Sequence, residues 1–279
     1  MSDHSARRTG APAPRTSLVV ILILAVGALS TAAQASEKKG VGVWEPHARE
    51  HLAQLHVAWY YTWTPHPVEG APPAEFVPMI WGGSNVSVQI KALPRRVSIL
   101  LTINEPDEKK QANMSVERVA RLWPRLSARA DRVSSPAAEH AMGTWIEQFL
   151  RIAHRRHLKT SFMAVHLYGG TDAGRFLARL DAIHERYRMP IWLTEFGVAD
   201  WDAAPWRRKS TVNRYSEEAV LQFMKEVLPG LERRPYVIRY AWFGAGAGVG
   251  EELRTSRLFE SDGTLTPLGR FYSNFDAAH

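Results

Sequence analysis

Two stretches that end in glutamate decide the fold: Ile99-Leu100-Leu101-Thr102-Ile103-Asn104-Glu105-Pro106 and Ile191-Trp192-Leu193-Thr194-Glu195-Phe196-Gly197. Each is a short and nearly continuous apolar run, the pattern of a strand that is buried on both faces of a parallel sheet. Each run then stops at a carboxylate. We therefore expect two parallel strands with an acidic side chain at the carboxyl end of each.

Further apolar runs surround these two and bring the number of expected strands to eight. They cover residues 41–43, 57–61, 76–80, 132–135, 162–166 and 238–242. Apolar residues at helical spacing separate several of them, at 145–153, 176–187 and 220–231. Strands that alternate with helices predict a parallel sheet with crossover helices. Eight strands in about 240 residues fit a compact α/β fold of the (β/α)8 TIM-barrel type better than an open sheet.

Two features depart from an ideal barrel pattern. Pro78 lies within the third expected strand, where it removes a hydrogen-bond donor, and residues 64–98 show little periodicity. No change in composition marks a linker. We therefore predict a single catalytic-type domain over residues 36–279.

The N-terminal residues have the pattern of a secretory signal peptide. Arg7, Arg8 and Arg15 precede an apolar run from Leu18 to Leu29, and Ala33-Gln34-Ala35 supplies small residues for cleavage. The run is short for a bilayer-spanning helix, which needs about 20 residues, so a retained anchor is the alternative. We expect residues 1–35 to be removed, which lowers the formal net charge from +7 to +5. The mature protein is then secreted or periplasmic, with no membrane attachment.

Composition excludes several classes of protein. With 45% hydrophobic residues, 10 Trp and no Cys, the chain is neither disordered nor a disulfide scaffold. Its basic residues occur in short, separated runs, so we expect no nucleic-acid partner. The glycine-rich segment 244–250 matches no dinucleotide or phosphate-binding motif, and His154 and His157 lack a third ligand. We therefore expect no cofactor and no metal, and a monomer.

Glu105 and Glu195 are the candidate catalytic residues. Active sites of (β/α)8 barrels lie at the carboxyl ends of the strands. Side chains of a strand point to alternate faces, so Glu105 lies on the same face as Ile103, and Glu195 on the same face as Leu193. If that face is the interior of the barrel, both glutamates face the pocket. One such carboxylate could pair with an arginine or cap a helix. Two across one pocket favour glycoside hydrolysis, which needs an acid and an ionised partner.

The surrounding motifs resemble those of glycoside hydrolase family 128. The resemblance runs in order from about residue 40 to residue 272, and its blocks are WYYTW at 59–63, FVPMIWG at 76–82, NEPD at 104–107 with QANM at 111–114, SPA at 135–137, HLYG at 166–169, WLTEFG at 192–197, RYAWF at 239–243 and DGTLTPLG at 262–269. The family consists of compact (β/α)8 endo-β-1,3-glucanases. The resemblance therefore implies an exported enzyme that acts on β-1,3-glucan, a polysaccharide partner.

The same resemblance implies roles for individual residues. Glu105 would be the general acid/base and Glu195 the nucleophile of a retaining, double-displacement mechanism. Asn104 is suited to hold the sugar 2-hydroxyl, and His166 and Tyr168 could hydrogen-bond to the nucleophile or the substrate.

Tryptophans at strand ends supply candidate stacking faces for sugars. They are Trp44, Trp63, Trp81 and Trp242. Each alone could equally belong to the core, but together around one rim they predict at least two platforms. Trp201 and Trp206, in a loop after Glu195, could form a wall of the cleft.

Two positions depart from the family pattern: Thr62 stands where the family usually has Asn, and Leu167 where it usually has Trp. Neither touches the acid or the nucleophile, so the departures concern the substrate. The alternatives are another β-glucan, an acidic exopolysaccharide, or a catalytically silent carbohydrate-binding barrel.

Overall fold

The computed structural model describes residues 1–2, 36–44, 46–207, 209–246 and 248–276. Apart from its first two residues, the expected signal peptide lies outside the described residues. Among the helices of the described part, none combines the length and the apolar character that crossing a bilayer requires.

Every pair of neighbouring strands is parallel, as the alternating sequence pattern predicts. The strands are β1 (Lys39–Gly42), β2 (Trp59–Tyr61), β3 (Glu75–Phe76), β4 (Met79–Ile80), β5 (Val97–Asn104), β6 (Ala130–Ala137), β7 (Met163–Gly169), β8 (Ile191–Val198) and β9 (Val237–Trp242). They form a six-stranded sheet in the order β3-β2-β1-β9-β8-β7 and a three-stranded sheet in the order β4-β5-β6.

The two sheets adjoin at both ends and so make one barrel. At the first seam, β3 and β4 are two pieces of the expected third strand, which Pro78 interrupts. The Val77 amide donates to the Tyr60 carbonyl, whereas the Pro78 carbonyl accepts from Leu101 on the other sheet. At the second seam, Ser134 in the middle of β6 and Phe162, the residue before β7, form a parallel bridge. The predicted ring of eight strand positions is confirmed.

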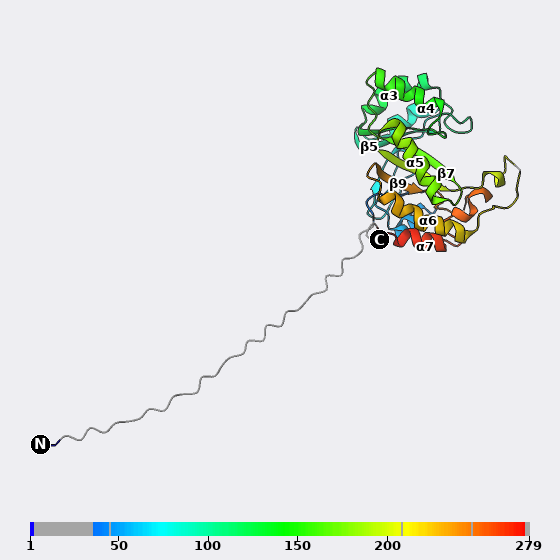
Figure 1. The fold of residues 1–279 in the computed structure, drawn as a ribbon. Coiled ribbons are helices and arrows are strands. Elements are labelled where there is room, and N and C mark those ends of the chain that lie inside the picture. The colour runs from blue at the N-terminus through cyan, green and yellow to red at the C-terminus, as the bar shows by residue number, and fades with distance from the viewer. Residues whose placement is uncertain (3–35, 45, 208, 247, 277–279) are drawn as a thin grey trace. The chain divides into compact units, whose positions relative to one another are not determined.

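Helices cover the outside of this ring (Figure 1). They are α1 (Ala48–Leu55), α2 (Val86–Ala92), α3 (Val116–Ser127), α4 (Thr144–Arg155), α5 (Ala173–Tyr187), α6 (Glu217–Glu232) and α7 (Pro267–Asn274), with short 3-10 turns η1 (Trp201–Ala203) and η2 (Glu251–Ser256). Side chains of Ser115, Asp172, Ser216 and Thr266 accept a backbone N–H of the first turn and so fix where α3, α5, α6 and α7 begin. Residues 62–74, all described, contain no helix between β2 and β3.

The core has two layers. The inner layer consists only of residues on or beside strands, including Trp59, Leu101, Phe162 and Trp192, and it fills the barrel. The outer layer joins the other face of the strands to the helices. Because large side chains fill the interior of the barrel, the free space for a ligand lies at the carboxyl ends of the strands.

Candidate active site

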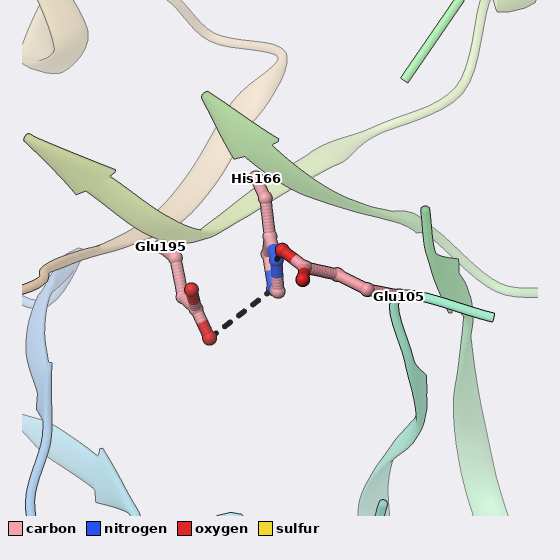
Figure 2. Close-up of side chains that lie close together, drawn as sticks. All are labelled: Glu105, His166 and Glu195. Carbon is pink, nitrogen blue, oxygen red and sulfur yellow. Dashed lines mark hydrogen bonds and ion pairs between the residues drawn. The ribbon is translucent and has the colours of Figure 1, made fainter. Parts of the chain in front are cut away.

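Glu105 and Glu195 meet at the carboxyl end of the barrel (Figure 2). Glu105 follows the last residue of β5, and Glu195 lies near the end of β8. His166 on β7 stands between them. Three strands therefore deliver one titratable side chain each to the same point.

The backbone reaches this arrangement by irregular pairing and not by simple alternation. Leu101 belongs to the inner layer, but Ile103 packs in the outer layer. The β5–β6 register shifts on both sides of Thr102, and Ile103 and Glu105 have left-handed φ angles of 40° and 37°. A β-branched residue rarely adopts this conformation, so the strand end is strained where it presents the acid.

A similar irregularity presents Glu195. Trp192 fills the barrel interior, whereas Ile191 and Leu193 face the helices, so simple alternation would point Glu195 outward. Register shifts between Val165 and His166 on β7 and between Leu193 and Phe196 on β8 reverse the phase. The structure brings both carboxylates together beside His166, but the phase argument for Glu195 was wrong, because bulges set the direction of its side chain.

His166 contacts both carboxylates. Its Nδ1 lies 2.8 Å from Oε1 of Glu105, and its Nε2 lies 3.5 Å from Oε1 of Glu195. One oxygen of each carboxylate and one ring nitrogen of His166 all lie within 4.8 Å of one another. The side chain of His166 is 2% exposed, compared with 14% for Glu105 and 8% for Glu195, so Glu105 is the more accessible carboxylate.

Two further donors are directed at Glu195. The Trp63 indole N–H and the Tyr168 hydroxyl each donate at 2.8 Å, to opposite oxygens of the carboxylate. The Tyr61 hydroxyl lies 3.5 Å from Oε1 and donates at 2.9 Å to the Thr194 carbonyl. The prediction that Tyr168 hydrogen-bonds to the nucleophile candidate agrees with this geometry. Tyr61 was not among the predicted site residues, although it shares a strand phase with Trp63.

Burial and charge shift the pKa values of this cluster. Burial, together with the charge of Glu105, raises the pKa of Glu195, and His166 and the Trp63 and Tyr168 donors act in the opposite direction. Burial lowers the pKa of His166, but the two carboxylates outweigh it and leave that pKa above its usual value. Burial and the charge of Glu195 also raise the pKa of the Tyr61 and Tyr168 hydroxyls, so both remain donors.

Asn104 lies beside Glu105 with one side-chain atom free. Its Nδ2 donates to Oε1 of Gln111 at 3.2 Å. Its Oδ1 is buried and has no hydrogen-bond partner in the structure. An unsatisfied buried acceptor is costly unless a ligand donates to it. Asn104 therefore holds an acceptor next to the acid candidate that no described residue satisfies.

Two of the predicted tryptophans line a groove. Trp63 and Trp81 border a cavity of about 390 Å³ together with residues of the loop after β2 and of α2. Trp44 is half-buried against Trp63, with ring centroids 5.7 Å apart. The indole of Trp63 thus faces the groove and holds Glu195 at the same time.

Trp242 does not offer a stacking face, and that prediction is corrected. It is fully buried, its N–H donates to the Ser256 carbonyl at 2.7 Å, and its ring packs edge-on against Phe196. The next residue, Phe243, is partly exposed, and its ring lies 5.9 Å from Trp63 and 5.8 Å from Tyr168. The end of β9 therefore presents Phe243 to the site.

The two departures from the family pattern have different positions. Leu167 is 4% exposed and packs in the outer layer, so it faces away from the pocket and its change concerns packing and not sugar stacking. The Thr62 hydroxyl donates to the His66 carbonyl at 2.8 Å. It orders the loop that forms one side of the groove.

Glu105, His166 and Glu195 are also the one group in the described part of the chain with the donor types and spacing for a metal ion. In the present arrangement His166 uses its Nδ1 on Glu105, so these atoms already satisfy each other. The geometry is that of two carboxylates held by an imidazole at a distance suited to acid/base and nucleophilic chemistry.

Residues 40–272 match the family model described as a glycosyl hydrolase catalytic core. The chain is similar to the solved subgroup I family 128 endo-β-1,3-glucanase of Amycolatopsis mediterranei in complex with laminaritriose, at 31% identity and a TM-score of 0.72, over 85% of this chain and 99% of that one. The chain belongs to glycoside hydrolase family 128. It is a glycoside hydrolase, as the sequence motifs predict.

Two further relatives of this family 128 enzyme are 26% identical to it. The subgroup V exo-β-1,3-glucanase of Cryptococcus neoformans is 26% identical, with a TM-score of 0.67, over 85% of this chain and 98% of that one. The curated "Alkali-sensitive linkage protein 1" of Schizosaccharomyces pombe is 26% identical over 80% of this chain. The chain spans only 41% of the length of that relative.

Proposed function

We propose that this family 128 enzyme is an exported, monomeric, retaining endo-β-1,3-glucanase. The observation that carries the proposal is the approach of Glu105 and Glu195: one carboxylate oxygen of Glu105 lies within 4.8 Å of one of Glu195. Retaining glycosidases place their carboxyl groups about 5 to 5.5 Å apart, whereas inverting enzymes need about 6.5 to 9.5 Å to admit a water molecule. The complexes of similar family 128 structures with laminari-oligosaccharides support the substrate.

The contacts of the two glutamates support the roles that we propose for them. Glu195 accepts hydrogen bonds from Trp63 and Tyr168, and donors on both oxygens fit an ionised nucleophile. Glu105 is more exposed and contacts only His166 among the titratable groups of the site, so it can reach the glycosidic oxygen and exchange its proton with water.

The reaction then proceeds in two displacements. Glu195 attacks the anomeric carbon while Glu105 gives its proton to the departing glycosidic oxygen, and a covalent glycosyl-enzyme forms. Glu105, now ionised, takes a proton from water. That water attacks the anomeric carbon and releases Glu195, so the configuration is retained.

His166 and Asn104 support this sequence. When protonated, His166 can donate to both carboxylates, which keeps their side chains in place while charge moves from one to the other. The free Oδ1 of Asn104 can accept a hydrogen bond from the sugar 2-hydroxyl, a contact that strengthens in the transition state. Trp63 and Trp81 supply apolar faces for the glucan in their groove.

Replacing Glu195 with glutamine tests the proposal. The variant keeps the shape of the side chain and removes the nucleophile, so turnover of laminarin should fall by at least about 10⁴-fold while binding of laminarihexaose stays measurable. Glu185→Gln is the matched control, because Glu185 is 74% exposed on α5. NMR of the first product of the wild-type enzyme should show the β-anomer.

Hydrolysis by Glu195→Gln at the rate of wild type would contradict the assignment of the nucleophile. A panel of β-1,3, β-1,4, mixed-linkage and acidic polysaccharides tests the substrate. The proposal predicts the highest kcat/KM on β-1,3-glucan and oligosaccharides of several lengths as early products. The N-terminal sequence of the exported protein should begin at Ser36, after the Ala33-Gln34-Ala35 pattern.

A further inference from the structure

A row of aromatic rings leads away from Glu195 along one side of the site. The Tyr168 ring, whose hydroxyl donates to Glu195, lies 5.4 Å from Trp201 in an edge-to-face arrangement. Trp201 in turn lies 6.3 Å from Trp206. Trp206 is 58% exposed and is the one tryptophan among the exposed large apolar side chains of the described residues.

The loop that carries the two tryptophans is held in place. It connects β8 to α6, and the structure describes it over residues 199–207 and 209–216. Arg214 donates from its backbone N–H and its Nε to the buried Asp200 carboxylate, each at 2.9 Å. Its Nη2 also lies 2.5 Å from Asp202. An exposed aromatic ring on an anchored loop can bind a ligand without a large cost of ordering.

The loop that follows Glu105 reaches the same ring. Lys110 Nζ lies 5.5 Å from the centroid of Trp206, a cation–π contact. Lys110 is joined to the acid by a tight turn, in which the Glu108 N–H donates to the Glu105 carbonyl and the Lys110 N–H to the Glu108 carboxylate. The loops that follow the two glutamates along the chain therefore meet at Lys110 and Trp206.

This position indicates which part of a substrate the surface contacts. The general acid stands beside the oxygen of the leaving group. A surface that borders the loop of the acid is accordingly placed for the sugars that depart and not for the sugar that is attacked. The groove of Trp63 and Trp81 is formed by other elements, the loop after β2 and α2.

We propose that Trp201, Trp206 and Lys110 form a binding surface for the leaving part of the glucan chain. The exposed face of the Trp206 indole stacks on a pyranose ring, and the Lys110 ammonium donates hydrogen bonds to its hydroxyl groups. The inference rests on the proposed function. It adds the location of the leaving-group subsites and the residues that select for polymeric substrates.

The test compares two substrates in the full-length mature enzyme. Laminarihexaose has glucosyl residues on the leaving side, whereas an aryl β-laminaribioside cleaved at its aryl group has none. Trp206→Ala should lower kcat/KM on the hexaose by about tenfold and leave the aryl substrate within about twofold. Trp206→Phe should restore part of the loss. Transfer of glycosyl groups to added laminaribiose should decline along with hexaose hydrolysis.

Val212→Ala is the matched control, because Val212 is 62% exposed on the same loop and outside the aromatic row. Three results would overturn the proposed binding surface. Trp206→Ala could lose the same kcat/KM on both substrates, Val212→Ala could lose as much as Trp206→Ala, or Trp206→Ala could cleave the hexaose faster than wild type. A wild-type enzyme that cleaves neither substrate would instead contradict the proposed function. An unchanged melting temperature of Trp206→Ala confirms that folding is intact.

Discussion

The hydroxyl of Tyr168 is one of the groups that favour the ionised form of Glu195. It donates at 2.8 Å to a carboxylate whose pKa burial already raises. In Tyr168→Phe the ionised form loses this donor, so the pKa of Glu195 rises further. Because the nucleophile must be ionised, the acidic limb of kcat/KM should move to higher pH. At neutral pH kcat should fall by roughly 10- to 100-fold, the worth of a hydrogen bond to a charged group.

A full pH profile of kcat/KM checks this prediction. Tyr187→Phe serves as the control, since Tyr187 ends α5 and takes no part in the hydrogen bonds of Glu195. A shift of the acidic limb to lower pH, or a profile that coincides with wild type, would show that Tyr168 does not act through Glu195.

The role of Glu105 depends on the leaving group. An acid is needed most when the departing sugar is a poor leaving group, so Glu105→Gln should lose at least about 100-fold more activity on laminarin than on an aryl β-laminaribioside with an activated phenol. Steady-state kcat/KM on both substrates measures the difference. Equal losses on the two would be incompatible with an acid role.

At the scale of elements, the strands could be predicted from sequence because each buried parallel strand is a short apolar run. β5 and β8 are confirmed over Ile99–Ile103 and Ile191–Glu195. The directions of the side chains at the strand ends could not be predicted from sequence. Bulges at Thr102 and between Leu193 and Phe196 depend on pairing with neighbouring strands, which no single strand encodes.

The same limit explains Trp242. Its position at the end of an apolar run resembles that of Trp63, but the packing of η2 decides its environment, because the Ser256 carbonyl accepts the indole N–H. Phe243 then occupies the site. Sequence alone gives the residue types at a strand end, whereas the choice between two adjacent aromatics comes from a segment that lies 14 residues further along the chain.

Lys39 joins β1 to the end of α7. Its buried ammonium donates to the carbonyls of Tyr272, Ser273 and Phe275 at 2.8 to 3.0 Å. Lys39→Met leaves these acceptors without a donor, and we expect it to lower the free energy of unfolding by about 3 kcal/mol. The kcat at 25 °C should not change, because Lys39 begins β1 at the end opposite the glutamates.

Chemical denaturation measures this loss of stability. Lys91→Met makes the same exchange at an exposed position on α2 and should change stability by less than about 0.5 kcal/mol. An equal effect of the two substitutions would mean that Lys39 contributes only through its charge.

The barrel closes without disulfide bonds, since the chain contains no Cys. Closure depends on two seams with fewer backbone hydrogen bonds than the regular sheets, at Pro78 and at the bridge of Ser134 with Phe162. The strands between these seams include β5, which carries the acid, while β8 lies in the larger sheet. The glutamates thus come from the two separate sheets, and their spacing depends on both seams holding.

Net charge gives the last prediction at this scale. The formal charge, +7 for the full chain and +5 after the expected cleavage, would attract polyanions, but two of the three titratable side chains at the centre of the site are carboxylates. A neutral glucan is bound by stacking and hydrogen bonds, which salt hardly screens. Raising NaCl from about 0.05 to 0.5 M should change KM on laminarin by less than about twofold, while binding of an acidic polysaccharide should weaken at least about tenfold. If salt raised the KM for laminarin as much as the Kd for the polyanion, the basic surface, and not the aromatic groove, would bind the substrate.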